Sequence, residues 1–196
     1  AKPALACALV ALASIAPATV HNALASGEFV PVSAQAGVTF FHGNAPGADG
    51  TYKPIPGVST DRIKQNLDAR ELVRGETDGS WNATSSAWFR RGLAFWRAEP
   101  GAAIELAGRK LWWFLTGRNY GDIYLPVLEN EEGFSRSERF APLPAAWLAF
   151  PALVAAAFLL RDARRRGPEL LLLLVPLATV VVFWYSPRYR LPAMPV

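Results

Sequence analysis

Residues 161–167, Arg161-Asp162-Ala163-Arg164-Arg165-Arg166-Gly167, form a basic turn between two apolar stretches at 140–160 and 170–186. Neither stretch contains a charged residue. About 20 apolar residues in a helix cross a hydrocarbon layer about 30 Å thick, so the pattern predicts transmembrane helices over residues 141–160 and 170–186. Short arginine-rich loops stay on the cytoplasmic side of a membrane. Residues 161–169 are therefore predicted to be cytoplasmic, and residues 187–196 to be an exterior exit that begins a possible further span.

A third apolar stretch lies at the amino-terminal end. Residues 3–26 contain no Asp, Glu, Lys or Arg, and Lys2 precedes them. One interpretation is a secretory signal with its small-residue cleavage region at 13–18. The other is a transmembrane helix over residues 1–21 that completes an upstream membrane domain. Both interpretations place the following segment outside. The predicted fold is thus a multi-pass α-helical membrane protein with a mostly α-helical, partly irregular exterior insert at residues 22–140.

Composition narrows the classes of function. The chain has 20 Lys and Arg against 16 Asp and Glu, a net charge of +4, and 52% of its residues are hydrophobic. The arginines beside the apolar stretches account for the excess charge, which indicates membrane topology and contact with lipid headgroups rather than binding of nucleic acid. A single cysteine, Cys7, excludes a disulfide within the chain, and two histidines offer no zinc cluster. The sequence therefore predicts no metal site. It also contains no glycine-rich nucleotide-binding loop.

The insert begins with short β-prone runs and a turn-rich loop. Residues 29–33 and 38–41 predict a small hairpin or two extended pieces. Residues 42–52 are so rich in Gly, Asn, Pro and Asp that they predict a loop. Asn44 and Asp49 are its best candidates for binding a ligand; the alternative is that they only form the turns that Asn and Asp favour. Glycines at 43, 47 and 50 permit close approach of the backbone to a neighbour.

Three helices are predicted in the rest of the insert, near residues 61–74, 85–98 and 101–116. Arg109-Lys110-Leu111-Trp112-Trp113-Phe114 places cations beside bulky aromatic side chains in the last of these. Such a helix can lie at a bilayer surface, where Trp sits at headgroup level and Lys and Arg reach the phosphates. The alternative is that the Trp side chains form the core of the insert.

Several of these segments together resemble a known family. The apolar helix that ends in His21-Asn22 is followed by a stretch, residues 27–50, similar to that of bacterial membrane glycosyltransferases related to the dolichyl-phosphate-mannose protein mannosyltransferases, a family 39-like group of the GT-C superfamily. Later segments are similar too, and they follow in the same order: Trp88-Phe89, Arg109-Lys110-Leu111-Trp112-Trp113-Phe114 and Ser186-Pro187-Arg188-Tyr189-Arg190-Leu191-Pro192.

The resemblance implies a multi-pass enzyme of the bacterial inner membrane. Such an enzyme transfers a sugar from a polyprenyl-phosphate-linked donor to a glycan, lipid or protein acceptor on the periplasmic side. Its catalytic acidic residue is expected on the first exterior loop, upstream of Ala1, so no catalytic residue is assigned in this chain. The metal requirement varies within the family, and we expect no particular cofactor.

The segment that follows the last apolar stretch, residues 187–196, contains the candidate site for the carrier phosphate. Arg188 and Arg190 can hold a phosphate through paired, charge-assisted hydrogen bonds, with Tyr189 lining the same site. The alternative is that these three residues are ordinary interfacial anchors. A different class of function also stays open, namely a non-catalytic, membrane-anchored binding or assembly protein with an exterior domain.

Overall fold

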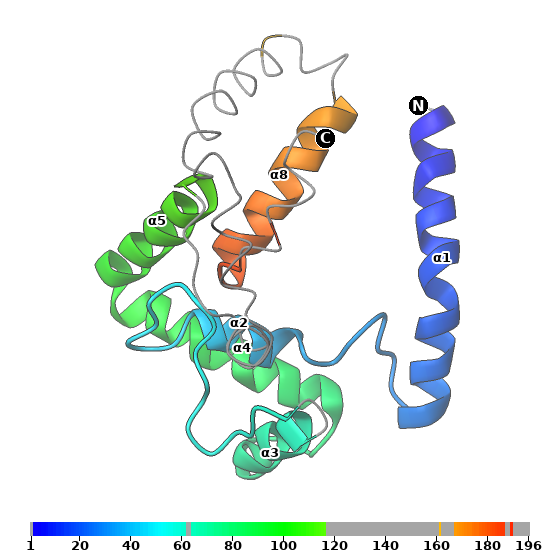
Figure 1. Ribbon diagram of the computed structural model, residues 1–196. Coiled ribbons are helices and arrows are strands. Elements are labelled where there is room, and N and C mark those ends of the chain that lie inside the picture. Colours follow the sequence, from blue (N-terminus) through cyan, green and yellow to red (C-terminus); the bar gives the residue numbers. More distant parts are fainter. Residues whose placement is uncertain (1, 62–63, 117–160, 162–166, 187–188, 190–196) are drawn as a thin grey trace, which may run out of the picture. The chain divides into compact units, whose positions relative to one another are not determined.

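A computed structural model describes residues 2–61, 64–116, 161, 167–186 and 189 of the chain. The described part is helical and contains no strand (Figure 1). The predicted span at 141–160 and the arginine-rich turn from Asp162 to Arg166 lie outside the described residues. The helices, in order, are α1 (Lys2–Ser26), α2 (Ala36–Gly43), α3 (Lys64–Leu72), the short 3-10 helix η1 (Arg74–Glu76), α4 (Trp81–Ala98), α5 (Pro100–Thr116) and α8 (Gly167–Val182).

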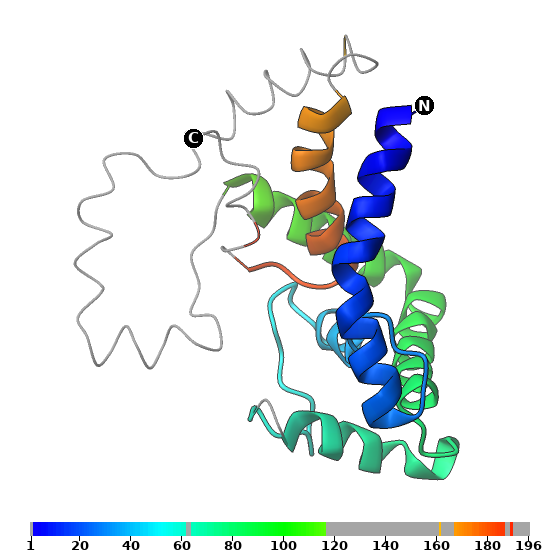
Figure 2. The same ribbon diagram turned by 90° about the vertical axis from the view of Figure 1, so that its right-hand side faces the viewer.

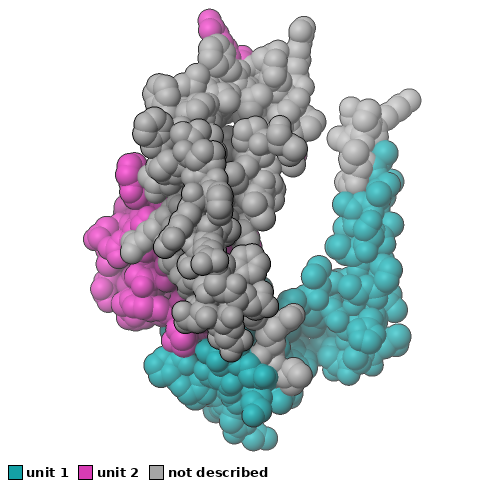
Figure 3. Space-filling model, viewed as in Figure 1, with its two compact units in different colours: residues 1–41, 55–91 teal, residues 42–54, 92–196 magenta. Residues whose placement is uncertain are grey.

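The chain divides into two compact units, which are coloured separately in Figure 3. Unit 1 contains residues 1–41 and 55–91, and unit 2 contains residues 42–54 and 92–196. Each unit therefore combines segments that are distant in the sequence.

Helix α1 is the one helix among the described residues that is long and apolar enough to cross a membrane. Its window Leu9–Ser26 has a mean hydropathy of 1.4, and none of it is buried within the protein. The hydroxyls of Ser14 and Thr19 donate hydrogen bonds to the helix's own carbonyls, at Val10 and Ile15, which reduces the cost of placing them in lipid. Figure 2 shows α1 as one continuous helix. It continues five residues beyond the predicted end at residue 21.

Helix α8 has 16 residues and is highly apolar, with Leu171, Leu174 and Val175 exposed. It begins three residues before the predicted span at 170–186 and ends four residues before that span's end. The multi-pass arrangement, which needs α8 and residues 141–160 as further spans, stays a prediction.

The β-prone assignment of residues 38–41 is wrong, because these residues lie in helix α2. Tertiary packing explains the difference. Val38 and Phe40 are buried. The ring centroids of Phe40 and Phe89 are 5.1 Å apart, and those of Phe41 and Trp88 are 5.0 Å apart. A helix presents these side chains to α4 together, whereas β propensity mainly reflects packing on a half-buried sheet that the described residues do not contain.

The core of unit 1 lies between α2, α3 and α4. Trp88 is 1% exposed, and its indole nitrogen donates a hydrogen bond to the carbonyl of Ala69 on α3 at 3.0 Å. The full cluster consists of Val38, Ile55, Val58, Ala69, Val73, Ala87 and Trp88, with Phe41 packed against it.

Helix α4 starts at Trp81, four residues before the predicted start at 85. Ser80 accepts a hydrogen bond from the amide of Ala83, as an N-cap residue does. The carboxylate of Glu28, distant in sequence, accepts hydrogen bonds from the amides of Trp81 at 2.7 Å and Asn82 at 2.9 Å. A carboxylate at a helix N-terminus satisfies free amides and opposes the positive end of the helix dipole. This distant cap extends α4 toward its N-terminus.

The predicted helix at 61–74 is observed as α3, which is shorter, followed by η1. Asp61 accepts a hydrogen bond from the amide of Lys64 at 3.0 Å, as an N-cap residue does. The predicted helix at 101–116 is observed as α5, which starts at Pro100.

Helix α5 packs against α8 in unit 2, and Figures 1 and 2 both show the two helices side by side. Trp113, Phe114, Val180 and Tyr185 form the core between them. The outer face of α5 carries exposed apolar side chains, with Ile104 at 68% and Trp112 at 63% exposure. Trp113 is therefore part of the core, as one interpretation of the aromatic run expects, whereas Trp112 lies on the exposed face; contact of this face with a bilayer surface stays a prediction.

Candidate functional site

The loop of residues 42–54 and the segment that follows α8 meet in unit 2, and we call this contact the loop–helix junction. The amide of Tyr185 donates a hydrogen bond to the carbonyl of Gly50 at 2.8 Å. The Asn44 side chain donates to the carbonyl of Val182, the last residue of α8, at 2.7 Å. The junction therefore joins two regions that the sequence offered as separate binding candidates.

Two glycines allow this approach. A side-chain carbon at Gly43 would collide with the carbonyl of Phe183. Gly50 has a φ of +100°, which glycine adopts without strain, and a side chain there would press against Lys110 and Trp113. The predicted close approach is confirmed at these two positions. At Gly47 no heavy atom lies within 4 Å of the corresponding point.

Asn44 is fully buried, and neighbouring protein groups use both ends of its amide. Its oxygen accepts hydrogen bonds from the Trp96 indole at 3.1 Å and from the Lys110 ammonium at 3.0 Å. Its nitrogen donates to α8 as described above. In this structure Asn44 therefore connects α4, α5 and α8, and its amide is directed at protein groups.

Lys110 is the residue of this site that sequence reasoning missed. It is 0% exposed, and its Nζ donates to the carbonyls of Val181 at 3.2 Å and Phe183 at 2.8 Å as well as to Asn44. A cation at this position satisfies the free carbonyls at the C-terminus of α8 and opposes the negative end of its dipole. A fully buried Lys is rare, but no sequence pattern separates Lys110 from its partly exposed neighbour Arg109.

Burial lowers the pKa of Lys110 to about 7. The three oxygen acceptors and the end of α8 act in the opposite direction, since each of them favours the ammonium form. None of the ion pairs found in the described part of the chain includes Lys110. Within the described segments its charge is thus balanced by the dipoles of the three oxygen acceptors and of α8.

Asp49 lies at the edge of the same loop and is partly exposed. Its Oδ1 accepts hydrogen bonds from the backbone amide of Thr51 at 2.9 Å and from the Thr51 hydroxyl at 2.7 Å. Partial burial raises the pKa of Asp49, but the two bonds from Thr51 and the nearby charge of Lys53 lower it more, so that the net pKa lies below its ordinary value. Asp49 is therefore an ionised carboxylate that shapes a turn, and its second oxygen lies 3.8 Å from Lys53 Nζ.

An aromatic group lines the junction. The ring centroid of Tyr52 lies 4.4 Å from that of His42 and 5.6 Å from that of Trp184. The ring centroids of Trp184 and Tyr189 are also 5.6 Å apart. Nδ1 of His42 is 2.6 Å from the carbonyl of Lys53 and donates to it, because a carbonyl only accepts. Burial lowers the pKa of His42, which that hydrogen bond partly offsets. The group fixes Tyr189 beside the junction.

The predicted site residues thus fall into three sets. Asn44 is buried inside the junction. Asp49 lies on the loop of the junction, and Tyr189 lies among its aromatic side chains. Arg188 and Arg190 lie outside the described residues. No group of three or more His, Cys, Asp or Glu side chains in the described segments could hold a metal ion.

None of the family models, curated proteins or solved structures compared with this chain matches it.

Proposed function

We propose that this chain is part of an integral-membrane glycosyltransferase that transfers a sugar from a polyprenyl-phosphate-linked donor to an acceptor on the periplasmic side. The observation that carries the proposal is the loop–helix junction. It fixes Tyr189, which Arg188 and Arg190 flank in the sequence, just beyond the end of the apolar helix α8. The end of an apolar helix lies at headgroup level if that helix spans the membrane, and a polyprenyl carrier places its phosphate at the same depth.

The chemistry assigns a clear role to the two arginines. During transfer the bond between the anomeric carbon and the carrier phosphate breaks, a bond from that carbon to an acceptor oxygen forms, and the acceptor loses its proton to a base. Negative charge develops on the departing phosphate. Arginine donors that already face this charge stabilise the transition state more than the ground state. Arg188 and Arg190 are proposed to do this, and neither acts as nucleophile or base.

The buried contacts of the loop–helix junction support the proposed role of Arg188 and Arg190. A binding group is precise when rigid elements hold it. Lys110 and Asn44 fasten the end of α8 to α5 and to the loop, so that the segment carrying Tyr189 leaves α8 from a fixed point. Lys110 and Asn44 are positioning residues in this proposal, since their polar atoms contact protein groups.

Transfer by the full-length protein that contains this chain tests the proposal. The assay uses membranes or nanodiscs and a labelled polyprenyl-phosphate-linked sugar. Arg188→Ala or Arg190→Ala should lower kcat by about 10²-fold, the usual effect of removing one donor to a developing oxyanion. Arg164→Ala, in the predicted cytoplasmic loop, is the matched control and should keep the wild-type rate.

Two results would contradict the proposal at different levels. Near wild-type rates in both exit variants would remove the phosphate role. A wild-type protein that transfers no sugar from any polyprenyl-phosphate donor, yet is folded, would favour the non-catalytic binding or assembly protein.

A further inference from the structure

The chain turns back on itself where α1 ends. Gly27 has a φ of +72°, which glycine adopts without strain, and its amide donates a hydrogen bond to the carbonyl of Ala23 at 2.9 Å, as is common at a helix C-terminus. Residues 28–33, which we call the return loop, then run back beside the last turns of α1. Both ribbon views show this course (Figures 1 and 2).

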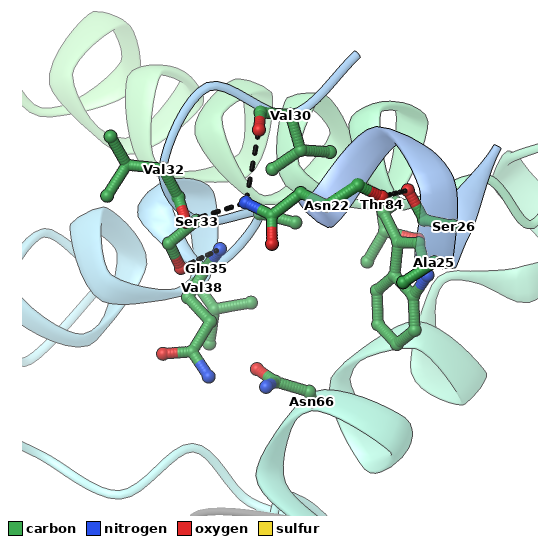
Figure 4. Close-up of a pocket in the computed structure, with 12 residues that line it drawn as sticks. Asn22, Ala25, Ser26, Val30, Val32, Ser33, Gln35, Val38, Asn66 and Thr84 are labelled. Carbon is green, nitrogen blue, oxygen red and sulfur yellow. Dashed lines mark hydrogen bonds between the residues drawn. The ribbon is translucent and has the colours of Figure 1, made fainter. Parts of the chain in front are cut away.

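Two side chains of α1 hold the return loop. The amide nitrogen of Asn22 donates to the carbonyls of Val30 at 3.1 Å and Val32 at 3.0 Å, and Figure 4 shows both bonds as dashed lines. The Thr19 hydroxyl, one turn earlier on the same face, shares its proton between its own helix and the carbonyl of Pro31 at 2.6 Å. Three consecutive carbonyls of the loop are thus bonded to α1.

The return loop is also fastened to α4. Glu28 caps α4, and the side-chain amide of Asn82 donates to the carbonyl of Phe29 at 3.3 Å. All four carbonyls from residue 29 to residue 32 therefore have donors within the protein. Lipid ester and phosphate oxygens accept hydrogen bonds but do not donate them, so a loop beside lipid must satisfy its carbonyls internally. The return loop meets this requirement.

The hydrogen bonds fix how far the loop returns. Thr19 lies seven residues and Asn22 four residues before Ser26, the last residue of α1. At about 1.5 Å per residue, the loop reaches back about 6–10 Å along the helix. The predicted span ends at residue 21, between these two contacts. If α1 crosses the membrane, the return loop therefore lies where hydrocarbon gives way to headgroups.

The side chains at this level are apolar and exposed. Phe29 is 72% exposed and Val32 is 61% exposed, and Val20 of α1 at the same level is 57% exposed. Residues 29–32 read Phe-Val-Pro-Val, without a polar side chain, whereas a turn in water usually carries Gly, Asn, Asp or Ser. This surface continues the apolar surface of α1, which is not buried within the protein. The edge of a bilayer would cover both.

We infer that the return loop inserts Phe29 and Val32 into the outer leaflet, at the boundary between acyl chains and headgroups. Interfacial apolar side chains reach about 5–10 Å into this boundary, which matches the distance that the loop returns. Because the loop is bonded to both α1 and α4, the insertion fixes the height of unit 1 at the membrane surface. The inference depends on α1 as a transmembrane helix and not on the transfer reaction, so it can be tested in a protein without turnover.

Fluorescence quenching measures the depth of the loop. The full-length protein, in a cysteine-free background, carries Phe29→Cys labelled with bimane and is reconstituted in vesicles of phosphatidylethanolamine and phosphatidylglycerol. A nitroxide near the headgroup end of the acyl chain should quench this label more strongly than a nitroxide near the terminal methyl, and aqueous iodide should quench it weakly.

Two further labels calibrate the measurement. Leu12→Cys, near the middle of α1 and 60% exposed, is the depth reference and should be quenched more strongly by the deeper nitroxide. Leu67→Cys, an exposed apolar position of α3 beside the charged Asp68, is the matched control and should be quenched by iodide rather than by lipid.

A double variant connects the depth to the hydrogen bonds. Thr19→Val with Asn22→Ala removes the donors to the return loop, and the label at residue 29 should then lose most of its quenching by the shallow nitroxide and gain quenching by iodide. Ser14→Ala, which removes a hydroxyl bonded to the carbonyl of Val10 within α1, is the matched control and should change neither. Thermal unfolding checks that both variants fold.

Four results would overturn the inference. Strong iodide quenching at residue 29 in the otherwise wild-type protein would place the loop in water. Weak quenching by every agent would show that another segment of the protein, or a second copy, covers Phe29. Unchanged quenching in the folded double variant would show that the bonds to α1 do not set the depth. A label at residue 12 that neither lipid quenches would show that α1 is not in the bilayer.

Discussion

The buried Lys110 should make the free energy of unfolding depend on pH in a range where few other side chains titrate. Its pKa is lowered from 10.5 to about 7 in the folded protein. Between these two values the unfolded chain binds more protons than the folded chain, so the free energy of unfolding rises with pH. The penalty for burying the ammonium is fully present below about pH 7 and is removed as the pH approaches 10.5.

The size of the effect follows from the shift. One pKa unit corresponds to 1.36 kcal/mol, so a change from 10.5 to about 7 corresponds to about 5 kcal/mol. About 3.5 kcal/mol of this is gained between pH 7 and pH 10, because the group is already half deprotonated at pH 7 in the folded protein; for a chain of 196 residues this is an increase in Tm of roughly 7–14 °C.

The assay is thermal unfolding of the full-length protein in nanodiscs, followed by intrinsic Trp fluorescence from pH 6 to pH 10. Lys110→Met keeps the length of the side chain and removes the titrating group, so the increase should disappear. This variant leaves the carbonyls at the end of α8 without their donor and should cost about 2–4 kcal/mol at pH 10, where the wild-type amine is neutral. Lys64→Met, on an exposed Lys of α3, is the matched control and should keep the wild-type pH profile.

Parallel pH profiles for the wild type and Lys110→Met would refute the reasoning. In that case the three oxygen acceptors and the end of α8 hold the ammonium against desolvation, and Lys110 remains charged throughout the range.

Further predictions concern packing, capping and topology. Gly43→Ala should lower the free energy of unfolding by about 3 kcal/mol because the added carbon collides with the segment after α8, whereas Gly108→Ala, in open space on α5, should raise it by about 0.5–1 kcal/mol; chemical denaturation measures both. Glu28→Gln should cost about 1 kcal/mol by weakening the cap of α4, and an unchanged denaturation midpoint would show that the cap contributes nothing. In a cysteine-free background, Asp49→Cys should react with an impermeant thiol reagent added to intact cells while Arg165→Cys should not, and the reverse result would invert the predicted topology.

Local sequence information predicted the existence of most helices in the described part of the chain. Asp61 caps the start of the region of α3, and Pro100 starts α5, as capping and turn residues commonly do. Boundaries failed where a distant group decided them. The start of α4 depends on Glu28, more than 50 residues away in the chain, and no local pattern indicates that contact.

The buried faces of the helices were harder to predict. Apolar residues occur on more than one side of α5, where Ile104 is 68% exposed and Leu111 is 37% exposed while Leu106 is buried. On α4, Leu93 is 43% exposed, whereas Trp88 is buried. Periodicity identifies an amphipathic helix, but a helix with apolar residues on two faces can bury either of them, and the neighbouring elements decide which.

The sequence by itself determined the apolar segments, the arginine-rich turn between two of them and the glycines that permit close backbone contact, because composition and backbone freedom are local properties. Only the tertiary structure decided that residues 38–41 are helical, that Asn44 and Lys110 are buried together at the end of α8, and that the loop after α1 returns along that helix. These features depend on which segments meet after folding. A hydrogen bond across 66 residues leaves no mark on the sequence near either partner.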